Sequence, residues 1–237
     1  MLIISPLVKL EIEKHALLAF PKECCGLIVD DGYFPYPNLA PNPEEDFELP
    51  IEVWSNWEGK GIIKAVVHSH PNAPTRPSAR DMQSQIDTNV PWVIVSTDGT
   101  LVTQPVIFGD PEAVSDLIGR PFLHGVTDCY SLIRDYYKIK LAKEIPEFPR
   151  NDEWWLQDQD LYTTGFEKAG FVEIPKHEVK VHDVFMITIR AKVINHAGIL
   201  VEDELFLHHL PNRASRREPA GIWASHVDRW VRHKDFM

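Results

Sequence analysis

Residues 61–81 read GIIKAVVHSHPNAPTRPSARD, and they decide the fold of the first half of this 237-residue chain. The stretch opens with an apolar, β-branched run, which predicts a buried strand. His68 and His70 end that strand, and side chains two positions apart in a strand point the same way. Ser78 then reads as the N-cap of a helix whose first turn contains Asp81. The pattern predicts a strand that ends in two histidines, then a loop, then a helix that begins with an acid.

Two imidazoles and one carboxylate from this stretch make a candidate metal site. His68, His70 and Asp81 would fill three positions of a tetrahedral zinc site and leave the fourth for water, as zinc catalysis requires. Glu23, just before another expected strand, supplies a carboxylate outside that set, which suits a general base. Taken singly, the histidine pair is a weak signal, Asp81 could be a helix N-terminal acid and Ser78 only a cap. The combination is what indicates a metal.

The combination resembles the signature of the JAMM (MPN-type) metalloproteases, in which H-x-H is followed by seven residues and then S-x-x-D. The upstream segment PKECCGLI, at 21–28, is similar to the part of that family where the first helix passes into the first strand and carries a glutamate. The resemblance covers about residues 1–107. It implies zinc ligation by His68, His70 and Asp81, a general base at Glu23, and a hydroxyl at Ser78 that stabilises the tetrahedral intermediate. Cys24 and Cys25 are expected to be buried, inert thiols rather than a fourth ligand.

A cysteine at the expected start of a helix opens the second candidate site. Cys129 begins the helix expected over 128–142, where the helix dipole and unpaired backbone N–H groups favour a thiolate. A lone cysteine in such a place is still more often structural than catalytic. A nucleophile needs a base within hydrogen-bond reach. His196, in the run VINHAGILV, is the candidate.

A β-hairpin selects the third group of this site. Strands are expected on both sides of a three-residue loop at 202–204, and that loop length pairs the residues that flank it. In this register His196 and His208 share a sheet face as diagonal neighbours, while His209 points to the opposite face. A loop of even length would place His209, and not His208, on the same sheet face as His196. We therefore expect His208 to orient the ring of His196.

The second half as a whole resembles the NlpC-type cysteine peptidases, a papain-like group that cleaves peptides of bacterial cell walls. The resemblance covers about residues 119–210 and rests on DCYSLIRDYY at 128–137, HDVFM at 182–186, NHAGILV at 195–201 and LHHL at 207–210. It implies Cys129 as the nucleophile, His196 as the base and His208 as the third member. Two positions depart from the family: Tyr130-Ser131 replaces a small Ser-Gly pair, and Phe122 stands where a tyrosine is frequent, so no hydrogen-bonding role is carried over to it.

The expected fold class is α+β with two domains. Residues 1–109 are expected to form a JAMM/MPN-like β-sheet with flanking helices, and residues 110–237 a papain-like NlpC-type domain. The boundary is placed where glycine and proline gather between 108 and 121, around a short helical piece at 112–118. The first half is further expected to contain a helix at 6–20 capped by Ser5, and strands at 25–29, 92–96 and 101–106.

The bulk properties exclude several classes of protein. The formal net charge of −11 argues against a nucleic-acid binder that works through a broad basic face. The three cysteines are an odd number and two are adjacent, so no disulfide framework is expected and a reducing compartment is indicated. No stretch approaches the ~20 apolar residues of a membrane span, and no signal peptide is recognisable. We expect an enzyme that is not secreted by the ordinary route.

The order of the two modules in a chain of this length resembles the tail assembly proteins of lambda-like phages, a match that the motifs HGVTDCYSL and LHHLP support. That resemblance implies synthesis in the cytoplasm of a host bacterium and action at the tail tip. The expected partners are peptidoglycan peptides and other tail-tip proteins, and the expected cofactor is Zn²⁺. The first hypothesis is a peptidase that opens cell-wall crosslinks during entry. The alternatives are a tail-tip assembly factor whose peptidase sites matter little, and a maturation protease that trims another tail protein.

Overall fold

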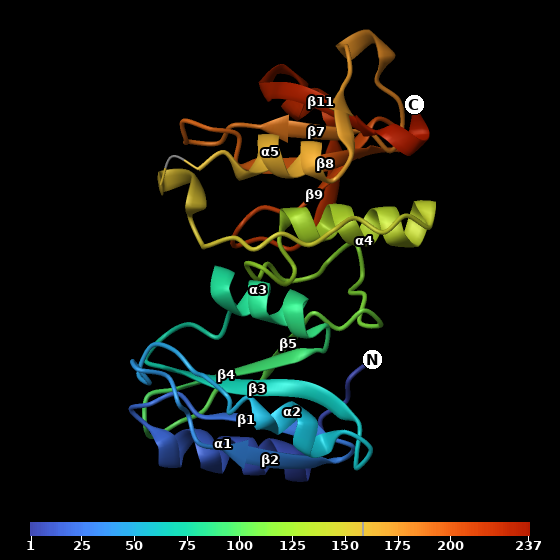
Figure 1. Cartoon of the computed structure of the whole chain (residues 1–237). Helices are drawn as coiled ribbons and strands as arrows, with labels where there is room; N and C mark the ends of the chain where they lie inside the picture. Colours follow the sequence, from blue (N-terminus) through green and yellow to red (C-terminus); the bar gives the residue numbers. More distant parts are fainter. Residues whose placement is uncertain (158) are drawn as a thin grey trace. The chain divides into compact units, whose positions relative to one another are not determined.

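The computed structural model describes residues 1–157 and 159–237, and it divides into two compact units (Figure 1). Unit 1 comprises Met1–Pro77 and Asp81–Ala113, and unit 2 comprises Ser78–Arg80 and Val114–Met237. Each unit has its own sheet and its own helices, so the predicted α+β class with two domains is confirmed. Within the described residues, no helix is both long enough and apolar enough to cross a bilayer.

Unit 1 is built on a five-stranded sheet in the order β2-β1-β3-β4-β5. β3 and β4 are parallel, and every other neighbouring pair is antiparallel. The strands are β1 (Cys25–Val29), β2 (Gly32–Tyr36), β3 (Ile63–Pro71), β4 (Trp92–Thr97) and β5 (Val106–Phe108), and the helices are α1 (Pro6–Ala19), α2 (Glu52–Trp57) and α3 (Ala79–Thr88). The predicted strand at 101–106 is wrong in extent, because this stretch contains only a bridge between Thr97 and Val102 before β5 begins.

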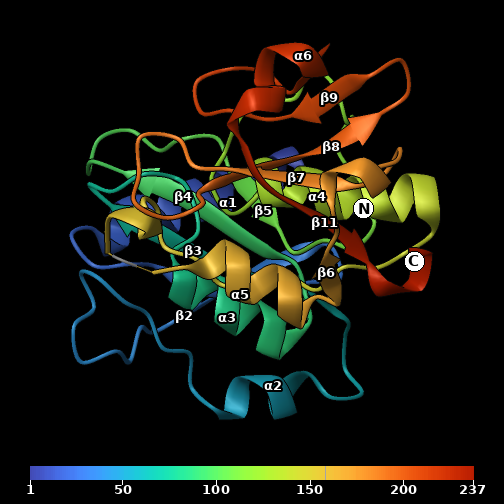
Figure 2. The same cartoon turned by 90° about the horizontal axis from the view of Figure 1, so that it is seen from above.

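The two faces of this sheet have different roles. α1 begins as predicted, with the Ser5 hydroxyl accepting a hydrogen bond from the backbone N–H of Val8 at 3.2 Å. Its buried side packs on one sheet face in an apolar cluster that includes Ile12, Val67 and Val93. α3 lies over the other face, as Figures 1 and 2 both show. Because side chains alternate along a strand, the residues between those of the apolar cluster point toward the α3 side.

Unit 2 is built on a six-stranded antiparallel sheet in the order β10-β9-β8-β7-β11-β6. The strands are β6 (Phe171–Glu173), β7 (Val184–Ile187), β8 (His196–Val201), β9 (Leu205–His208), β10 (Arg216–Pro219) and β11 (Val227–His233). The helices are α4 (Cys129–Leu141), α5 (Leu161–Lys168) and α6 (Ala220–Trp223). Short 3-10 turns are η1 (Trp154–Gln157), η2 (Lys176–Glu178), η3 (Ala224–His226) and η4 (Lys234–Phe236). The short helix predicted at 112–118 is wrong, since these residues form only turns and irregular backbone.

The long helix of unit 2 packs against the strand that carries the candidate base. α4 contacts β8, and the cluster between them contains Leu132, Ala197 and Ile199. The opposite sheet face carries a second apolar cluster with Phe185 and Phe206. The helix and the β8–β9 hairpin were both expected from the sequence, and they bring the start of α4 next to the start of β8.

Two candidate active sites

In unit 1, strand pairing brings Glu23 to the histidines. β1 and β3 pair with Cys25 opposite His68, so extending this antiparallel register by two residues sets Glu23 opposite His70. The carbonyl of Cys24 accepts from the backbone N–H of Ser69 at 3.1 Å, so the pairing does continue beyond β1. Glu23, His68 and His70 therefore emerge on one face of the sheet, the face away from α1.

The carboxylate of Asp81 meets both imidazoles on that face. His68 Nε2 and His70 Nε2 are 3.0 Å apart, and they lie 3.3 Å and 3.5 Å from the two oxygens of Asp81. All three residues are able to offer one ligand atom to a common point, with those atoms within 4.8 Å of one another. Two nitrogen lone pairs and a carboxylate that converge in this way are the donors that zinc binds in proteins. The donor set fits a single zinc-sized cation.

The surroundings hold the two rings in this orientation. His70 Nδ1 lies 2.9 Å from the carbonyl of Pro74, which accepts only, so Nδ1 carries a proton and Nε2 faces Asp81. The His68 ring stacks on Phe47 and meets the edge of Trp92. Burial lowers the pKa of His68, with Asp81 opposing the shift, and the neutral imidazole is the form that binds a metal. His68 Nδ1 is buried and has no hydrogen-bond partner among the described residues.

The other residues discussed with the metal site take up the following positions. Glu23 is buried at the head of β1, and Ser78 is exposed immediately before α3. Cys24 and Cys25 are buried free thiols. Burial raises the pKa of Cys24 to about 11 and that of Cys25 to about 12, so both are protonated at neutral pH. This agrees with the expected inert thiols.

In unit 2, a buried network fixes the start of α4. Asp128 caps the helix, accepting from the backbone N–H of Ser131 at 2.9 Å and from that of Gly125 at 2.8 Å. Arg150 donates to the same carboxylate at 2.9 Å, and both side chains are buried. Burial alone would raise the pKa of Asp128, but Arg150 and the backbone donors hold it well below its usual range. The next residue along the chain, Cys129, is therefore held in a defined place.

Cys129 itself does not have the environment that the sequence suggested. Its side chain is buried, and burial together with the Asp128 carboxylate raises the pKa of the thiol to about 11. The expectation of a thiolate favoured by the helix N-terminus is wrong, because desolvation of the sulfur outweighs the dipole. The sulfur lies 2.7 Å from the hydroxyl of Tyr162 on α5, and the backbone amide of Ala197 also interacts with it.

His196 and His208 of unit 2 are linked in series. β8 and β9 pair with Val201 opposite Leu205, which confirms the predicted register. His196 Nε2 lies 3.2 Å from His208 Nδ1, whereas His209 Nε2 lies 3.0 Å from the carbonyl of Arg213. Burial and the neighbouring histidines lower the pKa of His196 to about 3, so this ring is neutral at neutral pH.

His196 lies within hydrogen-bonding distance of His208. Among the described residues, no hydrogen bond joins Cys129 to His196. The sulfur is engaged by Tyr162 instead. Because α4 contacts β8 and the amide of Ala197 reaches the sulfur, the thiol and the candidate base are still neighbours. Catalytic hydrogen bonds are often absent before substrate binds.

Three polar residues near these groups were not found from the sequence. Arg150 and Tyr162 lie in the segment between α4 and β6, and Glu218 lies on β10. Glu218 accepts from His208 Nε2 at 3.0 Å. None of the three stands at a recognisable spacing from Cys129 or His196, and only the folded chain brings them near. Tyr162 supplies a hydroxyl that Phe122 lacks.

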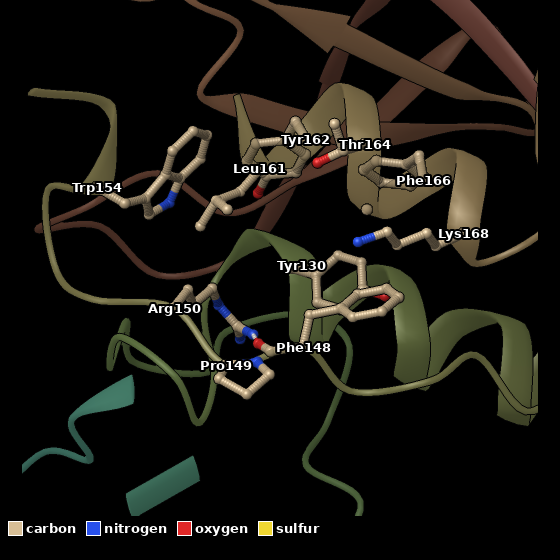
Figure 3. A pocket seen from close by; sticks show the side chains of 11 residues that line it. Tyr130, Phe148, Pro149, Arg150, Trp154, Leu161, Tyr162, Thr164, Phe166 and Lys168 are labelled. Carbon is tan, nitrogen blue, oxygen red and sulfur yellow. Dashed lines mark hydrogen bonds between the residues drawn. The ribbon is translucent and has the colours of Figure 1, made fainter. Parts of the chain in front are cut away.

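A cavity is lined in part by Tyr162. Figure 3 shows residues from α4 and the loop after it on one side of this cavity and residues of α5 on the other. Its volume is about 230 Å³, larger than the ~150 Å³ that accommodates a benzene ring. The lining is mostly apolar, with one guanidinium and one ammonium group: Tyr130, Phe148, Pro149, Arg150, Trp154, Leu161, Tyr162, Thr164, Gly165, Phe166 and Lys168. The cavity therefore has room for one aromatic side chain.

Comparisons with known proteins agree with the two halves. Residues 7–106 match Prok-JAB, the prokaryotic homologs of the JAB domain, and residues 119–232 match the NlpC/P60 family. The chain is 35% identical over 234 residues to the tail tip assembly protein K of Escherichia phage N15, covering 94% of this chain and 93% of that protein. It is 36% identical over 181 residues to the protein of the same name in Escherichia phage lambda, covering 76% and 83%.

A shorter match is with a probable TtuB-protein conjugate cleaving protease of Thermus thermophilus. It is 33% identical over 98 residues, covering 38% of this chain and 66% of that protein. The two family matches stand in the order that the sequence motifs predicted. The chain belongs to the tail tip assembly protein K family of lambda-like phages, with a JAB-type domain followed by an NlpC/P60 domain.

Proposed function

We propose that this protein is a tail-tip peptidase with two separate sites, a cysteine endopeptidase site in unit 2 and a zinc hydrolase site in unit 1. We place the domain boundary between residues 109 and 110, a few residues before the division of the two compact units at Ala113 and Val114. The observation that carries the proposal is the pairing of His196 with His208 at 3.2 Å, close to Cys129. The residue after His196, Ala197, has its backbone amide in contact with the Cys129 sulfur. The substrate class proposed for unit 2 is the peptide crosslink of peptidoglycan, supported by the NlpC/P60 match.

The chemistry of unit 2 begins from a neutral thiol and a neutral imidazole. Substrate binding turns the Cys129 thiol toward His196, which takes its proton as the sulfur attacks the scissile carbonyl. His196 then gives that proton to the departing amine, and a thioester joins the acyl group to Cys129. Water, deprotonated by His196, hydrolyses the thioester and restores the thiol. His208 holds the ring of His196 throughout, as the orienting member of a triad does.

In unit 1, His68, His70 and Asp81 would hold Zn²⁺, which supplies Lewis-acid polarisation of a carbonyl and a more acidic water. Glu23, on the same sheet face, would accept a proton from the attacking water. Ser78 would donate a hydrogen bond to the oxygen that becomes negative. The similarity to a probable conjugate-cleaving protease supports an amide bond of a protein or peptide as the target.

The second candidate function is maturation or assembly through other tail proteins. It is favoured by the names of the two phage relatives, which describe assembly rather than cell-wall hydrolysis. In that case the partners are tail-tip proteins inside the host cytoplasm. In the first case the protein acts at the virion tail tip on the cell wall.

Product analysis separates the two functions. The full-length chain is incubated with purified cell-wall muropeptides and, separately, with tail-tip proteins, and the products are identified by mass spectrometry. We expect cleavage of an amide bond in the muropeptides. Cleavage of a tail protein with intact muropeptides would establish the maturation function instead.

A further inference from the structure

We propose that Glu218 is a positioning residue that fixes the protons of the whole His196–His208 chain and so sets which nitrogen of His196 acts as the base. This inference rests on the proposed peptidase function of unit 2. Glu218 is on β10, next to the hairpin that carries both histidines. It does not touch Cys129, and it acts through the two imidazoles.

The carboxylate of Glu218 is held by three donors. One oxygen accepts from His208 Nε2 at 3.0 Å and from Trp223 Nε1 at 2.8 Å. The other oxygen is paired with Arg216 at 2.6 Å. The indole of Trp223 also packs edge-on against the His208 ring, at 5.1 Å between centroids. Burial would raise the pKa of Glu218, but Trp223, His208 and Arg216 lower it, so the group is a carboxylate that only accepts hydrogen bonds.

Because the Glu218 carboxylate only accepts, it determines which nitrogen of His208 and of His196 carries a proton. His208 Nε2 must carry a hydrogen in order to donate to Glu218. A neutral His208 then has a bare Nδ1, which only accepts, so His196 Nε2 must carry the hydrogen between the two rings. A neutral His196 is left with its lone pair on Nδ1. Both rings are neutral because burial lowers the pKa of His208 as well as that of His196.

The consequence for catalysis is a base with a defined lone pair. His196 Nδ1 is the ring nitrogen that takes the thiol proton from Cys129, while Nε2 keeps its hydrogen bond to His208. When His196 becomes positive, the negative charge of Glu218, on the other side of the His208 ring, stabilises it. Without an obligate acceptor beyond it, the His208 ring can carry its proton on Nδ1 and donate to Nε2 of His196. A neutral His196 then adopts the tautomer whose Nδ1 is protonated and not basic. Loss of the correct tautomer is costly in the comparable Asp-His pair of serine proteases.

The isosteric variant Glu218→Gln tests this, with Glu204→Gln, an exposed loop residue of the same hairpin, as the matched control. We expect kcat on muropeptides to fall about 10- to 100-fold in Glu218→Gln, the range typical of partners that orient a functional imidazole. KM should change little, because Glu218 does not contact substrate. The control should keep the parent kcat. Parent-like kcat in a folded Glu218→Gln would overturn the inference and leave the peptidase function standing.

A measurement on the parent protein needs no variant and no substrate. Nitrogen-15 NMR of the imidazole rings in the full chain reports which nitrogen carries the hydrogen. We expect Nε2–H on both His196 and His208 near neutral pH, and a mixture of tautomers in Glu218→Gln. A parent His196 with hydrogen on Nδ1 and a bare Nε2 would refute the role of Glu218. The expected tautomers in a chain that cleaves neither muropeptides nor tail proteins would refute the peptidase function and not the proton arrangement.

Discussion

Both units bring two imidazoles together at nearly the same distance, 3.0 Å in unit 1 and 3.2 Å in unit 2, but with opposite arrangements. In unit 1 the histidines are on one strand, and both Nε2 atoms point to a common place with Asp81. In unit 2, His196 and His208 are on neighbouring strands and linked in series, Nε2 to Nδ1, with Glu218 at the end. Converging lone pairs suit a cation, whereas a serial chain suits holding and moving a proton.

The largest effect that follows from this difference is the loss of unit 2 activity without its nucleophile. Cys129→Ser should lower turnover of muropeptides by at least about 1000-fold, because a serine hydroxyl is far harder to deprotonate at a buried site. Turnover is measured by chromatography of the released peptides. Cys24→Ser is the control, since that thiol is buried in the other unit. Equal rates for Cys129→Ser and the parent would exclude the cysteine mechanism.

The next effect concerns the converging histidines. The double variant His68→Ala, His70→Ala should lose bound zinc, and Asp81→Asn should weaken binding by at least about 100-fold, since even outer partners of a metal site contribute 10- to 100-fold. Glu23→Gln should keep the metal and lose any hydrolytic activity of unit 1. Metal content is measured by mass spectrometry of the purified chain. Stoichiometric zinc in the double variant would show that other residues hold the metal.

A smaller effect separates His196 from His208. His196→Ala should lose nearly all turnover, whereas His208→Ala should lose about 10- to 100-fold, because an orienting group is partly replaceable. His209→Ala serves as the comparison, since its ring is bonded to the carbonyl of Arg213 and lies outside the chain. Steady-state kinetics on one muropeptide suffices. A loss in His209→Ala greater than in His208→Ala would mean that the hairpin register does not select the third residue.

The smallest effects lie in the pH dependence of thiol alkylation. A thiol is unreactive below its pKa and reacts faster as pH rises through it. Because burial raises the pKa of Cys129 to about 11, its alkylation in the resting chain should be slow at pH 7 and accelerate only in strongly alkaline solution. Mass spectrometry of iodoacetamide-treated chain locates the label. Rapid labelling of Cys129 below pH 7 would show that the residue is a thiolate, as its position at the helix N-terminus alone suggested.

The variant Tyr162→Phe should change the pH dependence of Cys129 alkylation. Its hydroxyl hydrogen bonds to the sulfur and lowers the thiol pKa, so its removal should move the alkylation midpoint upward and slow labelling a few-fold at a fixed alkaline pH. Tyr136→Phe, whose hydroxyl bonds to His182, is the control. A downward shift in Tyr162→Phe would mean that Tyr162 keeps the thiol away from His196.

The two sites also differ in how far the sequence predicts them. The converging set of unit 1 lies within 68–81, and strand periodicity places both histidines on one face without knowledge of the fold. The pairing of His196 with His208 also follows from sequence, because a three-residue loop fixes the hairpin register. Tyr162 and Glu218 could not be predicted, since their positions depend on how α5 and β10 pack.

The charge state of Cys129 marks the limit of local reasoning. A helix N-terminus lowers a thiol pKa by a modest amount, and that effect is readable from the sequence. Desolvation is larger, and it depends on which segments cover the sulfur, here α5 and β8. The short helix expected at 112–118 failed for a related reason, since local propensity does not decide the structure of a segment that has little to pack against.

The independence of the two sites is tested most directly by one crossed experiment on muropeptide cleavage. The full chain and Cys129→Ser are each assayed with and without a strong zinc chelator, and the cleaved peptide is quantified. We expect the parent to cleave equally well in both conditions and Cys129→Ser to cleave in neither. Cleavage that disappears with the chelator, or that persists in Cys129→Ser, would contradict a cysteine peptidase in unit 2 that works without the metal site of unit 1.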